Sequence, residues 1–305
     1  MPEFELNPVN IPFLSPRTAG SLVVFLAILG GNTSSGSVVD LGAAAGFSVL
    51  TYNSNNTSDS AFQGGPIGVV NGNWVQSGGG QTNTQQPTNV ILSPGHTNNG
   101  PNVETTVFNA ALLNQAWTDA TNASAMLASL APTQTLGAIT GGMTISESVV
   151  GHYVLNISSI SLNQSALILS APAGSTFVLN ISGNITLNGG SQGNGLLLAG
   201  GLTSNDVVYN LTGANSNLTT SGGGNAQTIH GIVLATGSNA SVNLHPGAIY
   251  GEVIARTFTT SSGALVVVPE SSTAWAVIPA VLALLGFYSR RIFGKKTLPA
   301  GNAAV

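Results

Sequence analysis

A short stretch of sequence occurs twice between Tyr153 and Gly190. Residues 154–163 read VLNISSISLN and residues 178–188 read VLNISGNITLN, an offset of 24 residues with one residue inserted in the second copy. Within each copy, apolar and small polar residues alternate, which is typical of a half-buried β-strand. A unit of this size cannot bury its apolar side alone and must stack on a neighbouring unit. The repeat therefore predicts successive coils of a β-solenoid.

Further strands are expected between Thr135 and Val268, with Gly, Asn and Ser at the corners. Parallel strands are almost always joined by right-handed crossovers, so we expect a right-handed parallel β-helix. A β-sandwich of paired hairpins is the alternative, and the lack of two-residue Asn-Gly turns between strand pairs weakens it. Beyond the duplicated pair, the expected strands are Gly195–Gly201, Val207–Thr212, Ile229–Thr236, Val242–Leu244, Ile249–Arg256 and Leu265–Val268. Short strands are also expected at Ile67–Val70, Trp74–Val75 and Val90–Leu92.

One long helix is expected over residues 103–130. This segment contains no Gly or Pro, follows Pro101-Asn102 as a possible N-cap, and is stopped by Pro132. Its apolar residues recur at steps of three and four and form one stripe, which predicts a helix lying along the side of the stacked strands. The expected stripe consists of Val103, Val107, Ala110, Leu113, Trp117, Ala120, Ala123, Leu127 and Leu130.

Charged residues are scarce, at 5% of the 305 residues. Between Val38 and Val268 the sequence has one basic residue, Arg256, and seven acidic residues, so this region has a net charge of −6 (one minus seven). Nucleic acid is therefore a poor partner for it. The chain has no cysteine, which excludes disulfides, thiolate metal sites and a cysteine nucleophile.

Both ends of the sequence carry apolar runs. Residues 1–37 are expected to be an export signal, because Arg17 precedes the run 19–29 and small residues follow it, although a first buried strand is the alternative. Near the other end, Val268-Pro269-Glu270 precedes an apolar run at 274–288, which Arg290 and Arg291 follow. This run predicts a short transmembrane helix whose basic end stays in the cytoplasm. The intervening residues 38–268 are expected to be the β-helical ectodomain, and residues 292–305 a short basic cytoplasmic tail.

The segment 268–291 resembles the PEP-CTERM sorting signal of Gram-negative bacteria. That family has a Val-Pro-Glu-Pro box, an apolar helix and an arginine cluster; the present sequence has Ser271 in place of the second proline. The resemblance implies that the inner membrane holds the exported protein until an exosortase-type membrane protease cuts near Pro269-Glu270. Release to the cell surface or attachment there would follow. A plain membrane anchor is the alternative.

The region 151–257 is similar to the choice-of-anchor A domain of surface proteins that carry such tails. Segments 171–183 (APAGSTFVLNISG), 207–211 (VVYNL), 231–235 (GIVLA) and 247–255 (GAIYGEVIA) carry this resemblance, and Thr236 stands where the family often has proline. A second likeness, to the β-helical ice-binding adhesins, is carried by residues 41–50 (LGAAAGFSVL) and by the order of the expected elements, with one Ala-rich helix.

No catalytic, cofactor or metal site is expected. The histidines His96, His152, His230 and His245 are not spaced as metal ligands, and no Gly-x-Ser-x-Gly motif is present. Asn-x-Ser/Thr triplets at Asn156, Asn180, Asn210 and elsewhere are attributed to strand-edge composition. Acidic residues are scattered along the strands rather than paired, which disfavours a polysaccharide-cleaving β-helix; Glu147, Asp206 and Glu252 would be its candidates.

Three functional hypotheses follow from these patterns. The leading one is a non-enzymatic surface protein, sorted by the tail, that is adhesive or structural in the envelope or among extracellular polysaccharides. The first alternative is ice binding, in which Thr257-Phe258-Thr259-Thr260 and the outward Ser, Thr and Asn side chains order water on a flat face. The second alternative is a polysaccharide-active β-helix enzyme.

Overall fold

The computed structural model describes residues 38–77, 89–99, 105–189, 193–222, 227–261 and 263–268. In these residues every strand pairing is parallel, in one 15-stranded sheet and one seven-stranded sheet. The expected parallel β-helix is thereby confirmed, and the β-sandwich alternative is wrong. The right-handed sense of the coil stays a prediction.

The chain after the helix winds through coils of up to three strands each. A complete coil has three strands, and we call the sides on which its first, second and third strand lie face a, face b and face c. The long strand β9 serves both face a and face b, since its first half pairs with β11 and its second half with β12. These coils are β7 (Gln134–Ile139) with β8 (Met143–Ser146), β9 (His152–Asn163) with β10 (Ala166–Ala171), β11 (Thr176–Ile181) with β12 (Ile185–Asn188) and β13 (Gly195–Gly200), β14 (Val207–Leu211) with β15 (Asn217–Ser221) and β16 (Gln227–His230), β17 (Ile232–Ala235) with β18 (Ser241–Leu244) and β19 (Gly247–Tyr250), and β20 (Val253–Ala255) with β21 (Thr257–Thr260) and β22 (Leu265–Val267).

The two copies of the duplicated sequence pair with each other in two stacked coils. Val178 lies opposite Val154 and Asn180 opposite Asn156, at the offset of 24 residues. After the inserted residue, Ile185 lies opposite Ile160, at an offset of 25. Two of the expected strands are each divided in the structure, at Gly231 and Gly251, because both glycines turn a corner with positive φ (141° and 153°).

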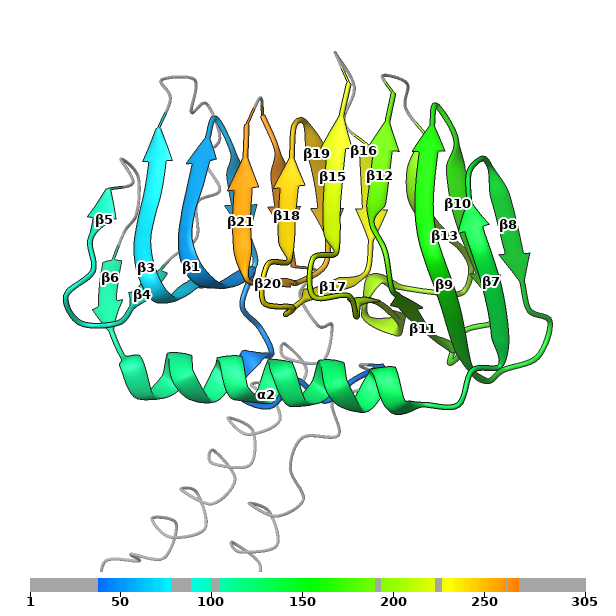
Figure 1. Cartoon of the computed structure of the whole chain (residues 1–305), viewed down its shortest axis with the longest axis horizontal. Coiled ribbons are helices and arrows are strands. Elements are labelled where there is room, and N and C mark those ends of the chain that lie inside the picture. Colours follow the sequence, from blue (N-terminus) through cyan, green and yellow to red (C-terminus); the bar gives the residue numbers. More distant parts are fainter. Residues whose placement is uncertain are drawn as a thin grey trace, which may run out of the picture. The chain divides into compact units, whose positions relative to one another are not determined.

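The first strands of the chain stack on the last ones. β1 (Val49–Ser58) pairs with both β20 and β21, and β2 (Ala61–Gln63) pairs with β22. Beyond β1 the stack continues with β3 (Ile67–Ser77), β4 (Asn89–Leu92), β5 (Asn98–Asn99) and β6 (Thr105–Phe108). Helix α2 (Ala110–Ser129) then runs back along the coils from β6 to β7, as Figure 1 shows. The coils are therefore contiguous in space but not in sequence.

The helix is shorter than the sequence predicted. Its N-cap is Asn109, whose Oδ1 accepts a hydrogen bond from Leu112 N at 3.0 Å, and the residues before it form β6. The expected start at residue 103 is wrong because Val107 pairs with Ile91 in the parallel ladder instead. The expected apolar stripe is confirmed at its centre, where Leu113, Trp117, Ala120, Ala123 and Leu127 are buried.

Two apolar cores hold the fold together. The larger one fills the inside of the coils and includes Phe62, Trp74, Phe177 and Phe258. The second lies between face a and α2, where the helix residues meet outward side chains such as Val178, Val208 and Ile232. The short 3-10 helix η1 (Gly42–Ala44) also contacts α2 and contributes Ala44 to this second core.

Much of what the sequence predicted at the two ends lies outside the described residues. These parts are the export signal 1–37, the sorting-motif residues Pro269 and Glu270, the apolar run 274–288, and the basic residues Arg290 and Arg291. Of the sorting motif, the structure describes Val268, whose N donates to Gln63 O at 3.0 Å. In the described part of the chain no helix has the length and apolar character to cross a membrane.

Candidate functional site

Face b presents a ladder of small polar side chains, one from each of six consecutive coils, and Val75 of β3 follows it in the next coil. We call this row the polar ladder; it comprises Ser161, Thr186, Thr219, Asn243, Thr259 and Asn56. Each member lies opposite the next in a parallel pair, so the row repeats at the strand spacing of about 4.8 Å. The residues on either side of each member, such as Leu187 and Val242, are buried inside the coil. No strand of face b contributes a charged residue.

Side chains on this face bond to one another across the coils. Ser241 Oγ donates to Asn217 Oδ1 at 2.8 Å, and Asn243 Nδ2 donates to Ser241 Oγ at 2.8 Å. The hydroxyl of Thr259 donates to Asn243 Oδ1, which links the next coil. These bonds restrict the rotamers of the four polar side chains that make them, on strands β15, β18 and β21.

Two of the four residues in the segment Thr257–Thr260 lie on this face. Thr257 and Thr259 point outward and are partly exposed, whereas Phe258 and Thr260 are buried in the coil. Thr260 Oγ1 lies 2.6 Å from Ser60 Oγ inside the stack. Alternation along the strand explains this division.

Three asparagines form a second ladder, on face a and partly under α2. Asn156, Asn180 and Asn210 lie opposite one another in consecutive coils. Asn210 Nδ2 donates to Asn180 Oδ1 at 2.8 Å, and Asn180 Nδ2 donates to Leu127 O of the helix at 2.8 Å. These three asparagines begin Asn-x-Ser/Thr triplets in the sequence, but the sequence did not predict that they hold the helix.

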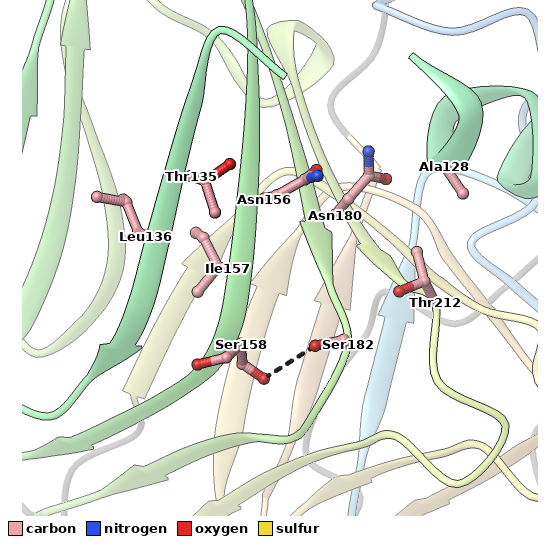
Figure 2. Close-up of a pocket in the computed structure, with 9 residues that line it drawn as sticks. All are labelled: Ala128, Thr135, Leu136, Asn156, Ile157, Ser158, Asn180, Ser182 and Thr212. Atoms are coloured by element: carbon pink, nitrogen blue, oxygen red, sulfur yellow. Dashed lines mark hydrogen bonds between the residues drawn. The ribbon is translucent and has the colours of Figure 1, made fainter. Parts of the chain in front are cut away.

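A hollow opens where α2 ends, beside this second ladder (Figure 2). It encloses about 290 Å³ and is lined mainly by hydroxyl, amide and small apolar groups. Ser182 Oγ donates to Ser158 O at its floor, at 3.5 Å. The buried Asn156 Oδ1 has no hydrogen-bond partner, because the amide of Asn180 is engaged by the helix. The lining residues are Ala128, Thr135, Leu136, Asn156, Ile157, Ser158, Asn180, Ser182 and Thr212.

The four histidines lie on separate parts of the fold. His152 Nδ1 lies 2.7 Å from Thr176 Oγ1, and His245 bonds to Ser261. The ring of His230 stacks on Tyr250 with 5.0 Å between centroids, and burial lowers its pKa. In the described residues no group of three or more His, Cys, Asp or Glu side chains comes close enough to hold a metal ion.

The three candidate acidic residues of the enzyme hypothesis bond to separate parts of the fold, Asp206 and Glu252 through their carboxylates and Glu147 through its backbone. Asp206 Oδ2 accepts from Thr203 N at 2.6 Å in the capping box of the 3-10 helix η2 (Ser204–Asp206), and the backbone N of Glu147 donates to Ser170 O. Glu252 Oε1 accepts from Gly46 N at 2.9 Å and so attaches the segment before β1 to the stack. Burial raises the pKa of Glu252 to about 7, and the hydrogen bond from Gly46 N opposes this rise because it favours the charged carboxylate.

The sequence from residue 19 to residue 266 matches the family described as an ice-binding-like adhesive domain. The chain belongs to this family. Of the two domain resemblances found in the sequence, the likeness to ice-binding adhesins is therefore the one that family membership supports. The resemblance to choice-of-anchor A domains and to the PEP-CTERM signal stays a prediction.

Solved structures of ice-binding proteins resemble this domain in fold. One from an Arctic yeast has 16% sequence identity and a TM-score of 0.51, covering 76% of this chain and 94% of its own. One from an Antarctic biological consortium has 20% identity and a TM-score of 0.50, covering 77% of this chain and 93% of its own. These likenesses support the solenoid fold. No curated protein sequence matches the chain.

Proposed function

We propose that this ice-binding-like domain adheres to ice through the polar ladder of face b. The observation that carries the proposal is the uncharged, regularly spaced row from Ser161 to Asn56, on a fold shared with ice-binding proteins. Ice is a repeating lattice of hydrogen-bonded water, so a surface that matches it needs donors and acceptors at repeated positions. A solenoid supplies that repetition because each coil places one outward residue about 4.8 Å from the last.

The absence of charge on this face suits the proposed role. A charged head group holds its own strongly oriented hydration shell, whereas hydroxyl and amide groups can both donate to and accept from a water lattice. The bonds among Asn217, Ser241 and Asn243 fix these groups before any contact with ice. Binding would then order few side chains, which lowers its entropic cost.

The location of the protein forms part of the same proposal. An exported domain, held at the membrane by the tail and then sorted by an exosortase-type protease, would present face b to the surroundings of a bacterium. Adhesion within extracellular polysaccharide is the alternative use of this surface. Fractionating cells that express the chain with and without residues 269–305 tests the location; a cytoplasmic protein in both cases would refute it.

Ice binding is tested with purified full-length chain. Thermal hysteresis and inhibition of ice recrystallisation would be measured for the wild type and for Thr219→Tyr, which places a bulky ring at the centre of the polar ladder. The matched control is Thr118→Tyr on the exposed side of α2, away from face b. We expect Thr219→Tyr to lose most of the activity and Thr118→Tyr to keep it. A wild-type chain without activity, or equal losses in both variants, would contradict the proposal.

A further inference from the structure

Face a carries four polar side chains in a row, and α2 covers only part of this row. Thr135 lies opposite Asn156, Asn156 opposite Asn180, and Asn180 opposite Asn210. The helix is hydrogen-bonded to Asn180 and Asn210 and ends at Ser129. Thr135 and Asn156 are therefore left beside the hollow that opens where α2 ends (Figure 2).

The covered part of the row shows which partners these amides take. Asn210 Oδ1 accepts a hydrogen bond from the hydroxyl of Ser124 at 2.6 Å, and Asn180 Oδ1 accepts one from Asn210 Nδ2 at 2.8 Å. Asn156 Oδ1 is buried and has no such donor. Because a buried oxygen without a donor costs free energy, a ligand that supplies the donor is favoured. A hydroxyl is suitable, since Ser124 already supplies one to the equivalent oxygen of Asn210.

The amide of Asn156 lies within reach of the hollow. Its side chain is partly exposed and lines the hollow. The torsion between Cβ and the amide of an asparagine has a broad minimum, so a modest rotation turns the oxygen towards the hollow. Thr135 and Ser158 line the same space, and their hydroxyls have no hydrogen-bond partner among the described residues. Two hydroxyls and one amide oxygen are thus available to a single ligand.

The rest of the lining sets the chemistry of that ligand. None of the 9 lining residues is charged, so an ionic ligand would lose its hydration without gaining a counter-charge. Ala128, Leu136 and Ile157 add apolar surface beside the hydroxyl and amide groups. A sugar ring offers the matching combination, because its hydroxyls lie around the edge and its C–H groups lie on the two sides. The volume of about 290 Å³ is just below the usual range of roughly 300–1,000 Å³ for ligand pockets, which suits one ring.

We infer that the hollow at the end of α2 binds one neutral sugar unit, with a sugar hydroxyl donating to Asn156 Oδ1 as Ser124 donates to Asn210. Thr135 and Ser158 bond to the neighbouring sugar hydroxyls. No aromatic residue lines the hollow to stack on the ring. Binding is therefore weak, with a millimolar dissociation constant for a ligand of about twelve non-hydrogen atoms. The site lies on face a, so it does not depend on the proposed ice binding through face b.

Sugar binding is tested by saturation-transfer-difference NMR of the purified full-length chain with D-glucose, D-galactose and D-mannose in separate titrations. Asn156→Leu removes the amide at a similar side-chain volume, and Asn163→Leu is its control at the exposed end of the same strand. We expect saturable binding of at least one sugar, unchanged by Asn163→Leu and weakened at least tenfold by Asn156→Leu. A wild type without saturable binding of any of them up to about 100 mM, or equal effects of the two variants, would overturn the inference.

Thr135→Val keeps the inference testable if Asn156→Leu fails to fold. Thr135 is exposed, so losing its hydroxyl at nearly constant shape should leave the fold intact and weaken binding about threefold. Thr144→Val, at an exposed position of β8, is its control and should bind as the wild type does.

Two further ligands define what the hollow selects. D-Glucuronate should bind more weakly than D-glucose, and tighter binding of the charged sugar would contradict a site for neutral ligands. The methyl glycoside of the sugar that binds separates the two sources of a sugar ring. Undiminished binding identifies the end of a polysaccharide chain and lost binding a free sugar, and both agree with the inference.

Discussion

The ring of Phe258 meets the ring of Phe62 edge-on, with 6.1 Å between centroids and 67° between planes. The two residues belong to opposite parts of the chain, since Phe258 lies in β21 of the last coil and Phe62 in β2 of the first. Phe62 in turn meets Trp74 of the next coil at 5.3 Å. This aromatic row crosses the junction where the N-terminal strands stack on the C-terminal ones.

Replacing Phe258 by alanine should loosen that junction. Its side chain is fully buried, and removing a buried phenylalanine costs about 3–5 kcal/mol of unfolding free energy. Urea unfolding followed by far-ultraviolet circular dichroism measures the change. The control is Thr186→Ala, on the outer side of β12 in a coil away from the junction, which should change stability by less than about 0.5 kcal/mol. Similar losses in both variants would show that the aromatic row is not what joins the two parts.

Sequence alone was sufficient for the coils that carry an obvious repeat. Asn156 and Asn180 are equivalent in the duplicated segments, and they are opposite each other in the structure. The sequence also placed the segment Thr257–Thr260 on a flat polar face, which is right for Thr257 and Thr259 and wrong for the buried Phe258 and Thr260. Both inferences rest on local periodicity, which the backbone of a strand imposes directly.

The junction and the helix start could not be predicted in the same way. Nothing near Val49 in the sequence indicates that it pairs with Val253, because the match depends on the return path of α2 along the stack. Residues 105–108 have apolar and polar side chains that suit a helix or a strand equally well. These residues form the strand β6 because β4 offers a parallel edge with which they pair.

The asparagine ladder on face a is expected to secure the helix. In Asn210→Ala the hydroxyl of Ser124 loses its acceptor at 2.6 Å, and Asn180 Oδ1 loses its donor at 2.8 Å. Each buried polar group left without a partner costs about 1–3 kcal/mol. Hydrogen exchange should therefore show faster exchange of the α2 amides, together with a lower free energy of unfolding.

The matched control for this ladder is Asn163→Ala, at the exposed end of β9. Its side chain projects from face b rather than from face a, so the exchange of the α2 amides should stay at the wild-type rate. If Asn163→Ala and Asn210→Ala change the helix equally, the hydrogen bonds to Ser124 and Leu127 are not what holds it.

Stability should fall as the pH rises, through Glu252. Burial raises the pKa of its carboxyl from 4.5 to about 7 in the folded protein, so the folded state binds a proton that the unfolded state releases. The associated stabilisation is fully present below about pH 4.5 and is lost as the pH rises through about 7. A shift of this size corresponds to roughly 3 kcal/mol at most.

Glu252→Gln isolates this effect because the amide has the shape of the protonated carboxyl and its oxygen can still accept from Gly46 N. Urea midpoints measured between pH 4 and pH 8 should be nearly equal for the two proteins at the acidic end. Above pH 7 the variant should be the more stable protein. A wild type and variant whose midpoints run parallel over the whole range would exclude Glu252 as the titrating group.

Gly251 is a position where the coil tolerates no side chain. It turns the corner between β19 and β20 with a φ of 153°, and a Cβ there would lie 2.0 Å from the carbonyl oxygen of Gly231 in the coil beneath. Gly251→Ala must therefore displace backbone in two coils, and we expect an unfolded chain or a loss of several kcal/mol. The control is Gly137→Ala in β7, where a Cβ meets nothing within 4 Å. That variant should be neutral or more stable by up to about 1 kcal/mol, because alanine restricts the unfolded chain. Thermal unfolding of both variants measures the difference, and a stable Gly251→Ala protein would mean that neighbouring coils are spaced more loosely at this corner than the structure shows.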